Sequence, residues 1–60
     1  MRVTEDVVIQ AAKEWAMRAH KDIFEAESTA LEALAALQNT LDTEKYQKAL
    51  ESLYEQYEKS

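Results

Sequence analysis

Apolar residues recur along most of this chain at the spacing of one face of an α-helix. They stand alternately four and three residues apart, without a polar interruption, at Val8, Ala12, Trp15, Ala19, Ile23, Ala26, Ala30, Leu34, Leu37 and Leu41. A flanking row, apolar except for one histidine, widens this face with Ile9, Ala16, His20, Phe24, Leu31 and Ala35. Thr4, which is followed by two acidic residues, is a typical helix N-cap. The pattern predicts one amphipathic helix over about 5–38.

The composition indicates an all-α fold. The chain contains no glycine and no proline, which removes glycine-rich phosphate loops and the hairpin turns that need positive φ angles. It also contains no cysteine, so disulfides cannot replace a large core. We expect a single helical domain over 1–60, with a core of limited size.

A second helix is predicted over about 42–58, after a short polar stretch at 38–40. Its apolar residues repeat at the same four-three-four spacing, at Tyr46, Leu50, Leu53 and Tyr57. Asp42 or Thr43 is well placed to cap it. A tight connection would return this helix antiparallel to the first one. The predicted fold is therefore an antiparallel helical hairpin.

The two predicted helices differ in length, which has a consequence for assembly. At 1.5 Å per residue they would be about 50 Å and about 25 Å long, so half of the long helix would be uncovered. We expect the uncovered apolar strip to be an interface, formed by Val7, Val8, Ala11, Ala12, Trp15, Ala16, Ala19, His20 and Ile23. A two-fold homodimer would cover it by completing a four-helix bundle. Trp15, at the centre of the strip, is the expected anchor.

A three-helix bundle is the alternative fold. Thr29 and Glu32 have the Thr-x-x-Glu spacing of a capping box, which marks the start of a helix. A break near 27–29 would allow three helices to fold over one another and to cover the Trp15 strip within one chain. The apolar repeat continues through this point, which favours the unbroken helix.

Residues that could carry chemistry are few. His20 is the only histidine, and its helical neighbours would be Ala16, Met17, Ile23 and Phe24, which neither bind metals strongly nor relay protons. The carboxylates fall on the solvated faces of the predicted helices, and a catalytic pair needs a concave, partly dry setting. We expect no enzyme activity, no cofactor, no metal and no small-molecule substrate.

Charge is unevenly distributed along the chain. The net charge is −5, and residues 22–44 contain six acidic residues and no basic one, namely Asp22, Glu25, Glu27, Glu32, Asp42 and Glu44. In a hairpin these residues would surround the turn and make one end of the molecule negative. Such an end could bind a basic partner.

These features predict a small protein-protein interaction module. We expect a regulator or inhibitor that binds itself and a larger protein through a helix face and the acidic end. The alternatives are a structural subunit of a helical assembly and, with less support from seven dispersed basic residues, a regulator associated with nucleic acid. No apolar run is long enough for a membrane span, and we expect a cytoplasmic protein.

Overall fold

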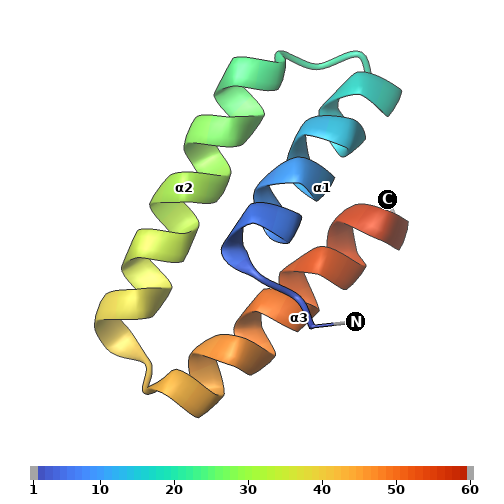
Figure 1. Cartoon of the computed structure of the whole chain (residues 1–60). Helices are drawn as coiled ribbons and strands as arrows, with labels where there is room; N and C mark the ends of the chain where they lie inside the picture. Colours follow the sequence, from blue (N-terminus) through green and yellow to red (C-terminus); the bar gives the residue numbers. More distant parts are fainter. Residues whose placement is uncertain (1, 60) are drawn as a thin grey trace.

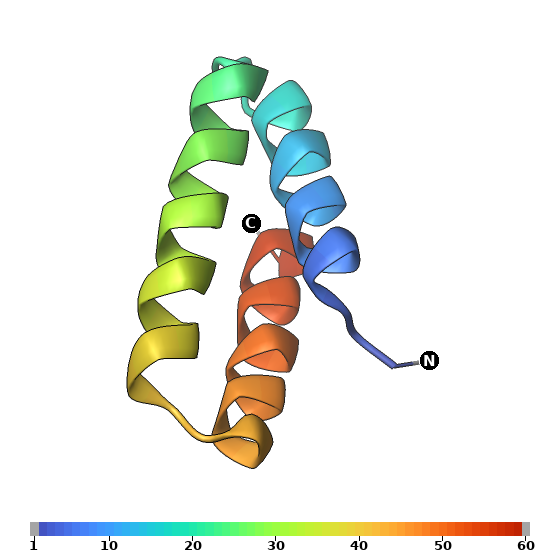
Figure 2. The same ribbon diagram turned by 60° about the vertical axis from the view of Figure 1, so that its left-hand side comes forward.

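The computed structural model describes residues 2–59 and consists of three α-helices. They are α1 (Glu5–Arg18), α2 (Ile23–Thr40) and α3 (Thr43–Lys59). Figure 1 shows α1 antiparallel to α2, and α3 diverging from α2 beyond the connection that joins them. Figure 2 shows the same three helices from another side. α1 contacts both other helices much more extensively than α2 and α3 contact each other, so α1 is the centre of the fold.

The prediction of an all-α chain is confirmed, whereas the hairpin with one long helix over 5–38 is wrong. The chain breaks between Arg18 and Ile23, so the three-helix alternative describes the number of helices correctly. The predicted place of that break, near 27–29, is also wrong, because Thr29 lies inside α2.

The break begins with a Schellman motif at the end of α1. The N–H of Lys21 donates to the carbonyl of Ala16 at 2.8 Å, and the N–H of His20 donates to the carbonyl of Met17 at 3.3 Å. His20 has a φ angle of 57°, the left-handed conformation that this motif requires and that glycine usually supplies. The carbonyl groups at the end of α1 therefore have partners without a continuing helix.

Asp22 then starts α2 as its N-cap. One oxygen of its carboxylate accepts from the N–H of Phe24 at 2.9 Å and from the N–H of Glu25 at 3.2 Å. The two predicted caps are also present, because Thr4 accepts from Val7 at the start of α1 and Asp42 accepts from Lys45 at the start of α3. Each helix start thus has a side-chain acceptor for its unpaired N–H groups.

The core is small and surrounds α1. Its large buried residues are Val3, Val8, Leu34 and Leu50, with Val7, Ile9, Tyr46, Leu53, Tyr54 and Tyr57 packed around them. Four further buried residues are alanines, at positions 11, 12, 16 and 30, and small side chains allow helices to approach closely. The side-chain amide of Gln47 donates to the carbonyl of Val3 at 2.8 Å, which ties the N-terminal segment to α3.

The free-energy cost of the left-handed residue, compared with the gain from burial of Val8, explains why the helix ends after Arg18. A left-handed conformation at a residue other than glycine costs roughly 1–2 kcal/mol. Full burial of a valine alone stabilises by about 1.5–3 kcal/mol, and Val8 is completely buried. A continuous helix would leave this side chain and the neighbouring alanines facing water. The break at His20 costs less than the burial that it permits.

Candidate functional site

The predicted interface strip of the first helix is mostly inside the molecule. Val8 and the alanines at positions 11, 12 and 16 are buried by α2 and α3, and Val7 and Trp15 are half-buried. Only Ala19, His20 and Ile23, which lie at or beside the break, are exposed. The expectation of a bare strip is therefore wrong, because the chain covers most of it by folding back on itself.

The predicted acidic end is also corrected by the structure. Asp22 precedes α2 and Asp42 follows it, and a helix of 18 residues is about 27 Å long. The acidic residues between them are spread along the helix instead of gathering at one end. Glu25 and Glu32, seven residues apart, form an exposed row on one side of α2. Glu27 instead pairs with Lys13 of α1 at 2.8 Å.

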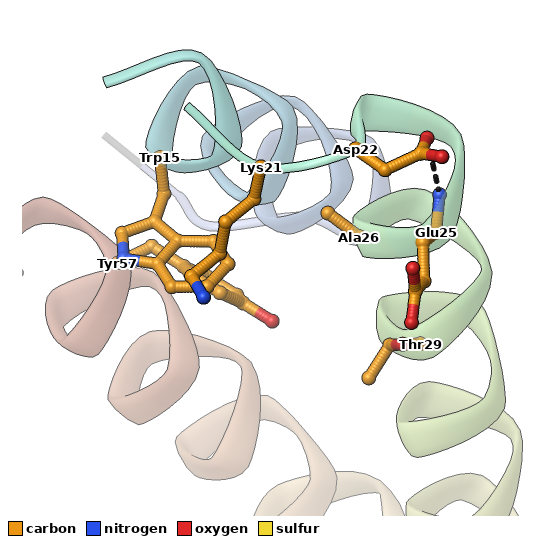
Figure 3. Close-up of a pocket in the computed structure, with 7 residues that line it drawn as sticks. All are labelled: Trp15, Lys21, Asp22, Glu25, Ala26, Thr29 and Tyr57. Carbon is orange, nitrogen blue, oxygen red and sulfur yellow. Dashed lines mark hydrogen bonds between the residues drawn. The ribbon is translucent and has the colours of Figure 1, made fainter. Parts of the chain in front are cut away.

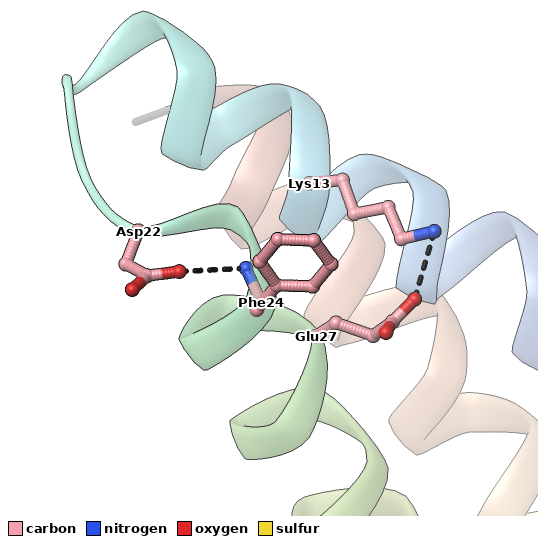
Figure 4. A network of polar contacts seen from close by, with 4 residues as sticks. All are labelled: Lys13, Asp22, Phe24 and Glu27. Atoms are coloured by element: carbon pink, nitrogen blue, oxygen red, sulfur yellow. Dashed lines mark hydrogen bonds and ion pairs between the residues drawn. The ribbon is translucent and has the colours of Figure 1, made fainter.

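Large apolar side chains are exposed on another face, which α1 and α2 share. Met17 is 60% exposed, Phe24 81% and Leu31 49%. Figure 4 shows Phe24 beside the ion pair between Lys13 and Glu27, which joins the two helices. Exposed apolar residues that cluster in this way often mark a binding surface.

Helix geometry makes this face continuous. The ion pair sets the register of the two antiparallel helices, with Lys13 opposite Glu27. Residues three or four positions away lie one turn along the same side of a helix. Met17 therefore lies near Phe24 on one side of the ion pair, and half-buried Ile9 lies near Leu31 on the other. We call these four apolar residues and the ion pair the α1–α2 face.

A cavity opens on the opposite side of α2, between α2 and the end of α3. Its volume is about 400 Å³, and Figure 3 shows its lining side chains, among them Trp15, Lys21, Glu25 and Tyr57. The rings of Trp15 and Tyr57 are tilted by 51° with centroids 5.8 Å apart. The guanidinium of Arg18 donates to the carbonyl of Tyr57 at 2.7 Å. This bond holds the end of α3 against α1, so it fixes the aromatic wall of the cavity.

Two tyrosines have perturbed pKa values. Burial raises the pKa of Tyr46 above its ordinary value of 10.0, and the nearby Glu5 carboxylate raises it further. The Tyr46 hydroxyl is buried and faces the Glu5 carboxylate, without a hydrogen bond of normal length and angle. A hydrogen bond to Glu58 and the negative charge of that residue raise the pKa of Tyr54. Both tyrosines belong to the packing of α3 on α1.

The other side chains considered for chemistry are dispersed. His20 is exposed in the connection between α1 and α2. Within residues 2–59, no three histidine or acidic side chains lie close enough together to hold a metal ion. No helix in the same part of the chain has the length and hydropathy needed to cross a membrane.

Sequence reasoning missed the α1–α2 face, although a signal for it is present. Ile9, Phe24 and Leu31 belong to the flanking row that widens the apolar repeat. On one continuous helix this row would be the margin of a single buried face. The break leaves Phe24 and Leu31 exposed and Ile9 half-buried on a side that two antiparallel helices share.

Comparisons of the chain with protein families, with curated proteins and with solved structures found no match.

Proposed function

We propose that this chain is a small, non-enzymatic, cytoplasmic interaction module that regulates or inhibits a larger protein by docking through the α1–α2 face. The observation that supports this proposal is the exposure of Phe24 and its apolar neighbours in a chain whose own core is small. Full burial of a phenylalanine or leucine side chain stabilises by about 1.5–3 kcal/mol. A partner that covers these residues would supply the burial that the chain itself does not.

The charges beside the face indicate the chemistry of the partner. On the side of α2 away from α1, the exposed row of Glu25 and Glu32 runs parallel to the row of Phe24 and Leu31. Residues 22–44 contain no basic residue, and of these two carboxylates only Glu25 shares the cavity with Lys21. The matching surface is an apolar groove with arginine or lysine along one rim.

A second copy of the chain is the competing occupant. Each chain has a net charge of −5, so two copies repel each other at low ionic strength. This charge favours a basic partner over a homodimer.

The occupant can be tested by site-specific photocrosslinking in the host cell. The variant Phe24→p-benzoylphenylalanine places the reactive group on the α1–α2 face, and the same substitution at exposed Glu55 of α3 is the control. We expect one adduct with a larger protein from position 24 and none from position 55. An adduct of twice the chain mass would show that a second copy is the occupant, and a series of higher masses would show an open assembly. Either result, or no specific adduct from position 24, would refute the proposal.

The purified partner then gives a quantitative test. The double variant Phe24→Ser with Leu31→Ser should weaken binding by about 2 kcal/mol or more, which is roughly thirty-fold in Kd. The matched double variant Phe24→Leu with Leu31→Met keeps the surface apolar and should bind within about three-fold of the original chain. Equal losses in both double variants would mean that the apolar surface does not carry the affinity.

A further inference from the structure

We infer that the cavity between Trp15, Tyr57 and the start of α2 binds the guanidinium group of an arginine from a partner protein, and that Lys21 occupies this site in the free chain. The cavity lies on the other side of α2 from the α1–α2 face. The inference goes beyond the proposed function and does not depend on docking at that face.

The shape of the cavity suits one cationic side chain. Its volume of about 400 Å³ lies within the range of sites that enclose small ligands. In Figure 3 the rings of Trp15 and Tyr57 form one wall, and Glu25 and Thr29 of α2 form the facing wall. The entrance is open to solvent because α2 and α3 diverge here. A side chain from another protein can therefore enter without a rearrangement of the helices.

The aromatic wall provides the first attraction for a cation. A cation within about 6 Å of an aromatic ring centroid is attracted to the negative face of the ring, and tryptophan is the strongest partner. The Lys21 ammonium already lies 5.8 Å from the centroid of the Trp15 ring. The aromatic wall of the cavity thus already faces a cation in the free chain.

The charges around the cavity provide the second attraction. Asp22 and Glu25 place two carboxylates at the start of α2, opposed by Lys21 in the lining and by Arg18, which is bonded to the carbonyl of Tyr57. When Lys21 swings out, these nearby charges sum to −1. The C-terminal ends of α1 and α3 lie beside the aromatic wall and favour cations, whereas the N-terminus of α2 on the facing wall disfavours them and is capped by the Asp22 carboxylate. An incoming arginine would neutralise the net negative charge that remains in the cavity when Lys21 leaves it.

Lys21 is a weak occupant that a partner can displace. It lies in the short connection between α1 and α2 and has an exposed side chain. In a Schellman motif this position usually carries an apolar residue packed on the preceding helix, and here the lysine takes that place over Trp15. A cation-π contact at an exposed site contributes only about two- to five-fold in affinity. Arginine stacks its planar guanidinium on an aromatic ring better than lysine does.

Trp15 is the only tryptophan, so its fluorescence and its indole N–H resonance report directly on the cavity. The probe is the peptide acetyl-Ala-Arg-Ala-amide, and the control is the same peptide with neutral citrulline in place of arginine. We expect saturable shifts of both Trp15 signals with the arginine peptide at millimolar concentration, and at least five-fold weaker binding of the citrulline peptide. The double variant Phe24→Ser with Leu31→Ser should bind the probe unchanged, which separates this site from the α1–α2 face.

Substitutions of Lys21 test whether its side chain competes with the arginine peptide for the cavity. Lys21→Ala should tighten binding of the arginine peptide by about two- to five-fold, because the internal competitor is removed. Lys48→Ala, at an exposed position of α3, makes the same change in net charge and should have no effect. Glu25→Gln should weaken binding by a similar factor. If Lys21→Ala does not fold, Lys21→Gln keeps the length of the side chain and carries the same expectation.

Two results would overturn the inference. Equal binding of the arginine and citrulline peptides would show that the cavity does not select a cation. Unchanged or weaker binding in the folded Lys21 variants would show that Lys21 does not compete for the site.

Discussion

Exchange of His20 for glycine and for alanine tests the chain break at its central residue. His20 has a φ angle of 57° and carries the left-handed turn between α1 and α2. In the three-helix fold glycine accepts this conformation freely, whereas alanine is strained. In a continuous helix over 5–38 the order would be reversed, because glycine is a poor helix former. The three-helix fold and the continuous helix therefore predict opposite signs for the difference in stability between the glycine and alanine variants.

The size of the difference follows from two opposing terms. A left-handed alanine costs roughly 1–2 kcal/mol, and glycine costs about 0.5–1 kcal/mol through the extra freedom of the unfolded chain. The middle values of these two terms predict that His20→Gly is about 0.8 kcal/mol more stable than His20→Ala. In a chain of this size that corresponds to a Tm higher by about 2–8 °C. A continuous helix predicts that the glycine variant is about 1 kcal/mol less stable.

Urea denaturation followed by circular dichroism at 222 nm measures this difference directly. The matched control is the same pair of substitutions at Ser28, which is exposed in the middle of α2. There the glycine variant should be less stable than the alanine variant by about 1 kcal/mol. If glycine is the less stable choice at position 20 as well, the break is not where the structure places it.

Three further substitutions test the packing. Leu50→Ala, in the core, should lose about 2–5 kcal/mol and unfold much of the protein at 25 °C, whereas Leu31→Ala on the exposed face should lose less than about 1 kcal/mol; similar melting curves would contradict the assignment of the core. Tyr46→Phe removes a buried hydroxyl without a hydrogen bond of normal length and angle and should raise the free energy of unfolding by up to about 1 kcal/mol. Because the pKa of Tyr46 is raised above 10.0 in the folded protein, ionisation of this hydroxyl leaves stability unchanged below pH 10 and lowers it as the pH rises through the folded pKa. Urea titrations should therefore show a smaller alkaline loss for Tyr46→Phe, and an identical loss would show that Tyr46 does not titrate as described. Lys13→Gln should lose less than about 1 kcal/mol, because the pair with Glu27 is one-third exposed; this loss should disappear in 1 M salt, and a loss that persists there would indicate packing by the lysine stem.

The helical content and most helix starts could be predicted because they depend on nearby residues. The apolar row of α3, from Tyr46 to Tyr57, needs only the helical period to be recognised. Thr4 and Asp42 bond to N–H groups three residues ahead, so a short window of sequence contains both partners. Asp22 caps α2 in the same way. The apolar repeat continues on both sides of Asp22, however, and therefore favours a continuous helix at this position.

The break and both candidate surfaces could not be predicted in this way. The usual marker of a Schellman motif is glycine, and His20 stands in its place. The Asp22-x-x-Glu25 spacing resembles the Thr29-x-x-Glu32 spacing, which also predicts a helix start but lies inside α2. One unbroken helix over 5–38, which the apolar repeat favours, leaves the apolar strip of the first helix to a partner chain. The same unbroken helix places Phe24 and Leu31 at the margin of a buried face, whereas both are exposed.

The amino-acid sequence by itself determined that the chain is helical, where α1 and α3 begin and which side of α3 faces inward, since each depends on contacts within about one helical turn. Only the tertiary structure decided which apolar rows are buried. The helical period is the same whether a helix continues or turns back after Arg18, so the pattern carries no information on that choice. The burial of Val8 and its neighbours by α2 and α3 outweighs the strain at His20, and this balance leaves Phe24 and Leu31 on the surface.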